Sequence, residues 1–170
     1  MKKTRGCRVV LAGLVVLILL HGSSVVRADH QRPMRTISLE IVRVKQIDNV
    51  DATKGGEFYA RVRINGLSFP KTGHREDRRD VRPGWTFVAI VREIPGVPIS
   101  IDIYDQDFPD SDDHCDASPV DGRKRLSISY NVTTRDISGD ATGHGGELIH
   151  VRGAGDGNRV EVWFRVSQAQ

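Results

Sequence analysis

The sequence predicts an all-β protein, folded as a two-sheet, antiparallel, eight-stranded β-sandwich. Six segments alternate apolar and polar residues with a period of two, which places their apolar side chains on one face of a strand. β-Branched and aromatic residues are frequent in these segments, as is typical of strands. Beyond the N-terminal apolar run, no stretch shows the period of an amphipathic helix. Two facing sheets are expected because each must bury its apolar face.

The predicted strands follow one another along the chain with short polar connections. They cover Arg35–Ile47, Phe58–Ile64, Trp85–Val91, Val97–Tyr104, Leu126–Val132 and Val160–Val166. Two shorter candidates, near Leu67–Phe69 and Glu147–Val151, complete the eight. The segment Thr133–Arg159 contains seven glycines and is predicted to be a long loop interrupted by at most one strand.

The first 28 residues are predicted to be a cleaved secretory signal peptide. They begin with basic residues, continue with an unbroken apolar run at Val9–Leu20, and end in Val26-Arg27-Ala28. Twelve apolar residues are too few to span a bilayer, so a retained anchor is the weaker alternative. We therefore expect a secreted or extracytoplasmic protein that is cleaved after Ala28.

Residues 29–170 are long enough for a single domain with its own core. The formal charge of +3 belongs to the precursor, and removing the five basic residues of the signal leaves −2. The high precursor pI is therefore no argument for a nucleic-acid partner. Only Cys115 remains, so no internal disulfide is predicted. An exposed Cys115 that pairs two chains is an open alternative.

A short acidic run follows the strand that ends near Tyr104. It contains Asp105, Asp107, Asp110, Asp112, Asp113 and Asp116. If the strand continues, Asp105 and Asp107 share the face of Ile101 and Ile103 and extend that row past the core. Such a concentration of carboxylates predicts a site for a hard cation, most simply calcium, which takes six to eight oxygen ligands in irregular geometry.

A second acidic loop joins the first two strands. It contains Asp51 and Glu57 at a spacing of six, with two glycines before Glu57 and with Asp48 just before the loop. Either residue alone is an ordinary turn residue.

These motifs resemble those of the C2 domain family. The sequence has Asp51-x5-Glu57-Phe58-Tyr59, then Val81-Arg-Pro83-Gly-Trp85, and then Asp105-x-Asp107-x5-Asp113. The resemblance covers roughly residues 36–132 and extends less completely to 160–166. It implies a β-sandwich that holds calcium in loops at one end. The positions that match the family's ligands are Asp51, Glu57, Asp105, Asp107 and Asp113, and additional candidate ligands are Asp48, Asp112 and Asp116.

The chain departs from the family pattern at several positions. Glu57 replaces an aspartate, Phe58 replaces a proline, and the glycine-rich segment is longer than the usual connection. Most C2 domains dock on membranes inside cells, whereas this chain is predicted to be secreted. The resemblance therefore implies a secreted module whose loops bind calcium and then an anionic lipid, glycan or protein surface, with Phe108 at the loop tip as a candidate contact.

Two other readings remain open. Calcium could serve only to stabilise an extracellular interaction or structural protein, or the carboxylates could belong to a metal-dependent hydrolase. The sequence has no nucleophile elbow, zinc-protease motif or phosphate loop, so catalysis is not expected. His114-Cys115 beside acids would suggest zinc, but no second cysteine or spaced histidine pair accompanies them. Asp140 and Asp156 suit either turns or a further calcium site.

Overall fold

The computed structural model describes residues 32–48, 56–73, 79–107, 111–155 and 157–169. The predicted signal peptide, Asp51 and Phe108 lie outside these ranges. Residues 32–170 form one compact unit. All the regular elements in the described ranges are strands. No helix there is long and apolar enough to cross a membrane.

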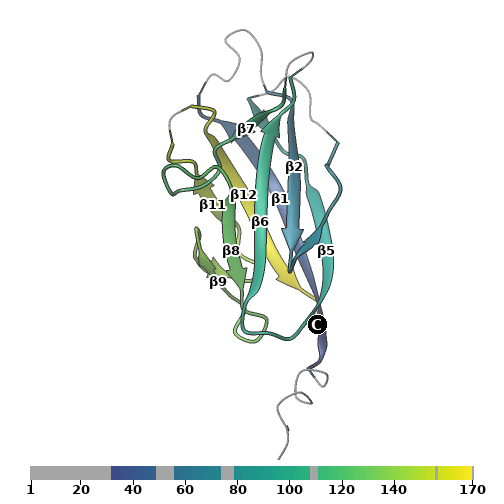
Figure 1. Cartoon of the computed structure of the whole chain (residues 1–170). Helices are drawn as coiled ribbons and strands as arrows, with labels where there is room; N and C mark the ends of the chain where they lie inside the picture. Colours follow the sequence, from purple (N-terminus) through teal and green to yellow (C-terminus); the bar gives the residue numbers. More distant parts are fainter. Residues whose placement is uncertain (1–31, 49–55, 74–78, 108–110, 156, 170) are drawn as a thin grey trace, which may run out of the picture. The chain divides into compact units, whose positions relative to one another are not determined.

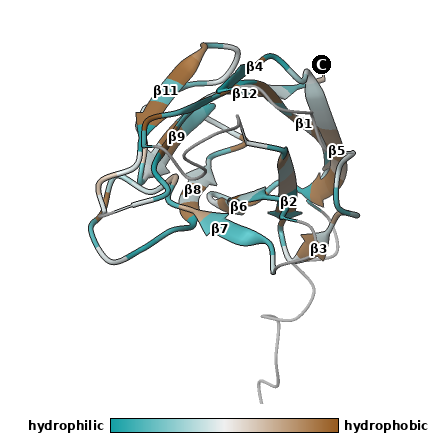
Figure 2. Cartoon of the chain, turned by 90° about the horizontal axis from the view of Figure 1, so that it is seen from above, coloured by the Kyte–Doolittle hydropathy of each residue, from teal (hydrophilic) through white to brown (hydrophobic). Residues whose placement is uncertain are grey.

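Twelve strands in the described residues form two antiparallel sheets, which confirms the predicted two-sheet sandwich (Figures 1 and 2). The first sheet contains β1 (Met34–Gln46), β4 (Asp80–Val81), β5 (Trp85–Arg92), β11 (Ile149–Arg152) and β12 (Val160–Gln168). The second contains β2 (Phe58–Ile64), β3 (Leu67–Ser68), β6 (Val97–Asp105), β7 (Asp113–Cys115), β8 (Leu126–Tyr130), β9 (Asp136–Gly139) and β10 (Gly143–His144).

The strand order places distant segments side by side. The first sheet runs β11-β12-β1-β4, and β5 also pairs with β1. The second runs β10-β9-β8-β6-β2-β3, and β7 pairs with the end of β6. Viewed from above in Figure 2, the two sheets form facing layers, and the core lies between them. The long strand β1 is therefore central in the first sheet, and the long strand β6 is central in the second.

The predicted alternation determines which side chains enter the core. In β5, Trp85, Phe87, Ala89 and Val91 are buried, whereas the residues between them are exposed. A β-bulge in β1 between Ile41 and Arg43 shifts its pairing with β12. Because a bulge inserts one extra residue, the buried series continues at Val44 and Gln46 instead of at Arg43 and Lys45.

The strand count is higher than predicted. Both short candidates are confirmed as β3 and β11, but four further short strands, β4, β7, β9 and β10, are present. The prediction that Thr133–Arg159 is a loop with at most one strand is wrong, because that segment contains β9 and β10 in addition to β11. Strands of two to four residues are too short to show alternation, and glycines such as Gly139, with a φ of 105°, obscure their pattern.

The end of the sandwich at which β6 terminates holds the predicted metal ligands that the structure describes. β1 runs towards Asp48, β6 ends at Asp105, and β2 and β12 begin there. In Figure 1 this end carries β7. The described residues that flank the two predicted acidic loops, Asp48 and Glu57 for the first and Asp105 and Asp113 for the second, therefore lie at one end, as the resemblance implies.

Candidate metal centre

Asp105 is the centre of the acidic cluster. It continues the inward row of Ile99, Ile101 and Ile103 on β6, and its exposed fraction is only 2%. Sequence alternation predicted this direction, but the carboxylate lies within the buried end of the interior instead of beyond it. Its Oδ1 accepts a hydrogen bond from the backbone N–H of Glu57, at 2.5 Å. A buried ionised carboxylate with one donor is costly unless a cation accompanies it.

Asp113 lies directly across from Asp105. The two residues pair in the antiparallel ladder between β6 and β7, so their side chains are on the same face of the sheet. Opposed like charges in such a pair destabilise a sheet. No lysine or arginine of the described residues lies within 4 Å of either carboxylate. The pair therefore lacks a protein counter-ion in the described part of the chain.

Two further predicted ligands contribute to the negative potential around Asp105. Burial raises the pKa of the Asp105 carboxyl to about 6, and the charges of Asp107, Asp113 and Glu57 raise it further against the Glu57 N–H bond. Three of the other predicted family ligands are thus near enough to Asp105 to raise its pKa. The fifth, Asp51, lies outside the described residues.

The hard oxygen donors of this cluster fit the chemistry of calcium. Within the described residues, however, no three His, Cys, Asp or Glu side chains are close enough to form a complete metal cage. The carboxylates surround Asp105 without converging on a common point. Completion of a site therefore requires adjustment of the loops or a contribution from Asp51.

Asp48 and Asp116, two of the additional candidate ligands, contact protein groups. Asp48 forms a bidentate ion pair with Arg159, whose Nε and Nη2 donate hydrogen bonds to the two carboxylate oxygens at 2.7 and 2.8 Å. The guanidinium hydrogen bonds hold the pKa of Asp48 below its usual value, against the opposing effect of burial. Asp116 accepts the backbone N–H groups of Ser118, at 3.0 Å, and Gly155, at 2.5 Å. Both side chains tie loops together at this end of the sandwich.

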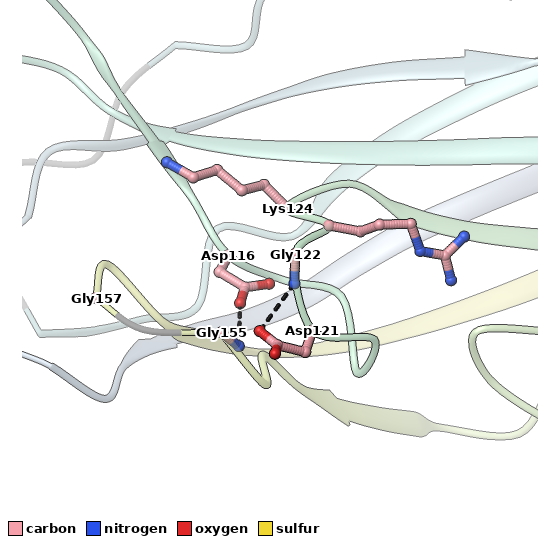
Figure 3. Close-up of a pocket in the computed structure, with 7 residues that line it drawn as sticks. Asp116, Asp121, Gly122, Lys124, Gly155 and Gly157 are labelled. Carbon is pink, nitrogen blue, oxygen red and sulfur yellow. Dashed lines mark hydrogen bonds between the residues drawn. The ribbon is translucent and has the colours of Figure 1, made fainter.

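A pocket of about 220 Å³ lies beside Asp116 (Figure 3). Its walls are the 121–124 segment and the turn that contains Gly155 and Gly157. In Figure 3 the Asp116 carboxylate points to the Gly155 N–H, Asp121 points to the Gly122 N–H, and the Lys124 ammonium extends away from both. The pocket carboxylates are therefore used for backbone hydrogen bonds.

The outer face of the β2–β6 sheet carries a feature that sequence reasoning missed. Tyr59, Tyr104 and His114 form a continuous ring stack, with centroids 5.1 and 4.5 Å apart. Arg61 lies over Tyr104, and Lys71 lies over Tyr59 at 3.7 Å. Regular alternation in β2 and β6 predicts that these tyrosines and arginines face outward. The stacking of the rings depends on which strands pair, and the sequence does not show that pairing.

Asp112, the remaining additional candidate, belongs to this outer face. Its Oδ2 accepts a hydrogen bond from the Tyr59 hydroxyl at 2.6 Å and lies 3.5 Å from the ammonium of Lys71. The hydrogen bond from Tyr59 holds the pKa of Asp112 below its usual value. Asp112 and Asp113 are consecutive, and only Asp113 lies opposite Asp105. The outer-face contacts thus draw Asp112 away from the centre.

His114 and Cys115 point to opposite faces of β7 and cannot share a zinc ion. His114 Nε2 lies 3.1 Å from the buried Asp102, which Arg125 also contacts. Burial lowers the pKa of His114. Cys115 has no exposed surface, and burial raises the pKa of its thiol, so a surface thiol that pairs two chains is excluded.

Gln46 makes the loop end of the interior polar on the opposite sheet as well. It is the last residue of β1, it is only 6% exposed, and it lies opposite Val160 in the ladder. Neither Nε2 nor Oε1 has a hydrogen-bond partner among the described residues. The remainder of the interior is a continuous apolar core. The loop end of the interior therefore contains buried polar side chains, Gln46 and Asp105, whereas the core is apolar.

The architecture is that of solved C2 domains. The chain is similar to a C2 domain protein from Ramazzottius varieornatus, with a TM-score of 0.54 and 13% identity over 82% of this chain and 90% of that one. It is similar to the calcium-bound structure of the paired C2 domains of extended-synaptotagmin 2, with a TM-score of 0.51 and 16% identity over 79% of this chain and 45% of that one.

Human GIVD cytosolic phospholipase A2 is a third similar structure, with a TM-score of 0.52 and 14% identity over 82% of this chain. This chain spans only 17% of the phospholipase and less than half of the extended-synaptotagmin 2 structure. No protein-family model matches the chain, and no curated protein matches it in sequence. Residues 32–170 thus form a C2-like domain, and the low identities show the fold alone.

Proposed function

We propose that this chain is an exported C2-like module that binds calcium through its acidic loops and then attaches to an anionic surface. The observation that carries the proposal is the ladder pair Asp105–Asp113, where two carboxylates oppose each other at a buried strand end. A divalent cation would remove this repulsion and supply the charge that the described residues lack. The calcium-bound extended-synaptotagmin 2 structure shares the fold and supports the choice of ion.

Glu57, Asp105, Asp107 and Asp113 would hold the ion, with Asp51 as the fifth predicted ligand. The charges of Glu57, Asp107 and Asp113 act on Asp105, which lies opposite Asp113 in the β6–β7 ladder. Calcium would offset part of the negative charge of the loops, and an oxygen of a partner's anionic group would complete its coordination. The longer side chain of Glu57 would shift one ligand oxygen relative to an aspartate.

The outer face of the β2–β6 sheet supports an anionic partner. Arg61 and Arg63 alternate outward from β2, are exposed, and have no carboxylate within 4 Å among the described residues. Lys71 lies on the same aromatic stack. Each basic residue near an anionic membrane contributes about 1 kcal/mol to binding. This face would therefore add electrostatic attraction beside the calcium loops.

Vesicle sedimentation tests the proposal. We expect residues 29–170 to sediment with phosphatidylserine-containing vesicles in calcium, and to stay in solution in chelator or with phosphatidylcholine vesicles. Arg61→Gln with Arg63→Gln should weaken binding about tenfold or more, because two attractive charges are lost. Matched changes on the opposite sheet, Arg43→Gln with Lys45→Gln, should have little effect. Binding that persists in chelator would contradict calcium-dependent attachment.

The alternative function, in which calcium only stabilises an extracellular interaction or structural protein, makes a different prediction. Calcium would then raise the unfolding temperature, while vesicle and glycan binding stayed negligible or independent of calcium. The tight contacts of Asp48 and Asp116 with neighbouring loops favour a stabilising role of this end. The two assays together separate the alternatives.

Export rests on residues 1–28 and has its own test. When the full precursor is expressed in a secreting host, we expect the exported protein to begin at Asp29, because Val26-Arg27-Ala28 presents small or aliphatic residues to signal peptidase. Intact-mass measurement of the exported protein checks this. Retention of the uncleaved precursor in the membrane would instead favour an N-terminal anchor.

A further inference from the structure

The described residues of the connection between β11 and β12, 153–155 and 157–159, contact both acidic segments of the candidate metal centre. The Gly155 N–H contacts the Asp116 carboxylate, and the Asn158 carbonyl accepts the Asp116 N–H at 2.8 Å. The adjacent Arg159 pairs with Asp48, which precedes the first acidic loop. One turn therefore holds both acidic segments, although they lie far apart in sequence.

Asn158 makes the contact closest to the centre. Its side-chain Nδ2 donates a hydrogen bond to Asp113 Oδ2 at 2.9 Å. The residue has a φ of 53°, a left-handed conformation that asparagine tolerates better than most residues. Asn158 thus combines the backbone conformation that the turn requires with an amide directed at a predicted ligand.

The hydrogen bond uses one oxygen of Asp113. Among the described residues, Oδ1 accepts no hydrogen bond. A neutral amide orients the carboxylate without cancelling its charge, whereas an ammonium or guanidinium in this place would compete with a bound cation. Asp113 is therefore held facing Asp105 with its charge preserved.

We propose that Asn158 is a positioning residue that sets the calcium affinity of the centre by fixing the orientation of Asp113. This inference rests on the proposed function. Groups that hydrogen-bond to metal ligands typically change metal affinity 10–100-fold when they are removed, because the ligand must then be ordered at the moment of binding. Asn158 lies 45 residues from Asp113, so the sequence does not indicate that the two residues interact.

The variant Asn158→Gly tests the proposal. Glycine adopts the same positive φ without strain, so the substitution removes the amide and preserves the turn. Asn65→Gly is the matched control, because Asn65 has a φ of 50° in the β2–β3 turn, at the other end of β2 from Asp105. Calcium titration calorimetry and melting in chelator are measured for both variants and for the unmodified protein, all as residues 29–170.

We expect Asn158→Gly to lower the calcium association constant about tenfold or more while its melting temperature in chelator changes little. Asn65→Gly should leave the association constant unchanged. An unchanged calcium affinity in Asn158→Gly would overturn the proposal, as would an increase, which would mean that the amide competes with the ion. If the unmodified protein binds no calcium, the proposed function itself fails, and that result is distinct from either of these.

Discussion

Calcium should raise the midpoint of thermal unfolding of residues 29–170 by about 5–10 °C over the value in chelator. A ligand that binds only the folded state at a hundred times its dissociation constant stabilises it by about 2.7 kcal/mol. Each kcal/mol shifts the midpoint of a domain near this size by about 2–4 °C. The effect is expected to be large because bound calcium would remove the repulsion between Asp105 and Asp113. Differential scanning calorimetry in calcium and in chelator measures it.

The double variant Asp105→Asn with Asp107→Asn should abolish this difference, because it removes two of the predicted ligand charges, including the buried one. Asp121→Asn with Asp136→Asn is the matched control, since both residues are exposed and lie outside the centre. The control should retain the full calcium shift. Equal melting of the unmodified protein in calcium and in chelator would refute calcium binding at this centre.

The sequence predicted the part of the centre that depends on strand alternation. Period-two patterning in β6 correctly placed Asp105 on the face of Ile101 and Ile103. The placement of the acidic loops at one end came from the resemblance to the C2 family, and the described residues that flank these loops lie at that end. The metal itself stays a prediction, since the described carboxylates form no complete cage.

The contacts between distant loops could not be predicted. The Asn158–Asp113 and Arg159–Asp48 contacts join residues 45 and 111 positions apart. They depend on β12 beginning beside the acidic run, and no local pattern encodes that neighbourhood. The same reason explains why β9 and β10 were not predicted: pairing with β8 and with each other stabilises these short strands, whereas their own composition does not.

The buried carboxylate of Asp105 predicts an unusual pH dependence of the calcium-free protein. Its pKa rises from 3.8 to about 6 on folding, mainly through burial. A carboxyl whose pKa is raised by folding contributes stability in full below about pH 4, and this contribution is lost as the pH rises through 6. Proteins with many paired carboxylates show the opposite trend, so this contribution must be isolated by a variant.

Asp105→Asn isolates it, since asparagine has the same shape and its Oδ1 can still accept the Glu57 N–H. In chelator at pH 7.5 we expect the variant to be more stable than the unmodified protein by about 2 kcal/mol, because one pKa unit corresponds to about 1.4 kcal/mol and partial solvent access reduces the full value. At pH 5 the gain should shrink. In saturating calcium the order should reverse, because the variant lacks a ligand charge.

Denaturant unfolding at the two pH values, with and without calcium, measures all four differences. Asp136→Asn provides a control of opposite sign, since hydrogen bonds from Thr134 and His144 hold the pKa of Asp136 below its usual value and its contribution grows as the pH rises. If Asp105→Asn destabilises the calcium-free protein at pH 7.5, the buried charge is already compensated within the chain. The cation would then be unnecessary at this strand end, and the main argument for a metal centre would be lost.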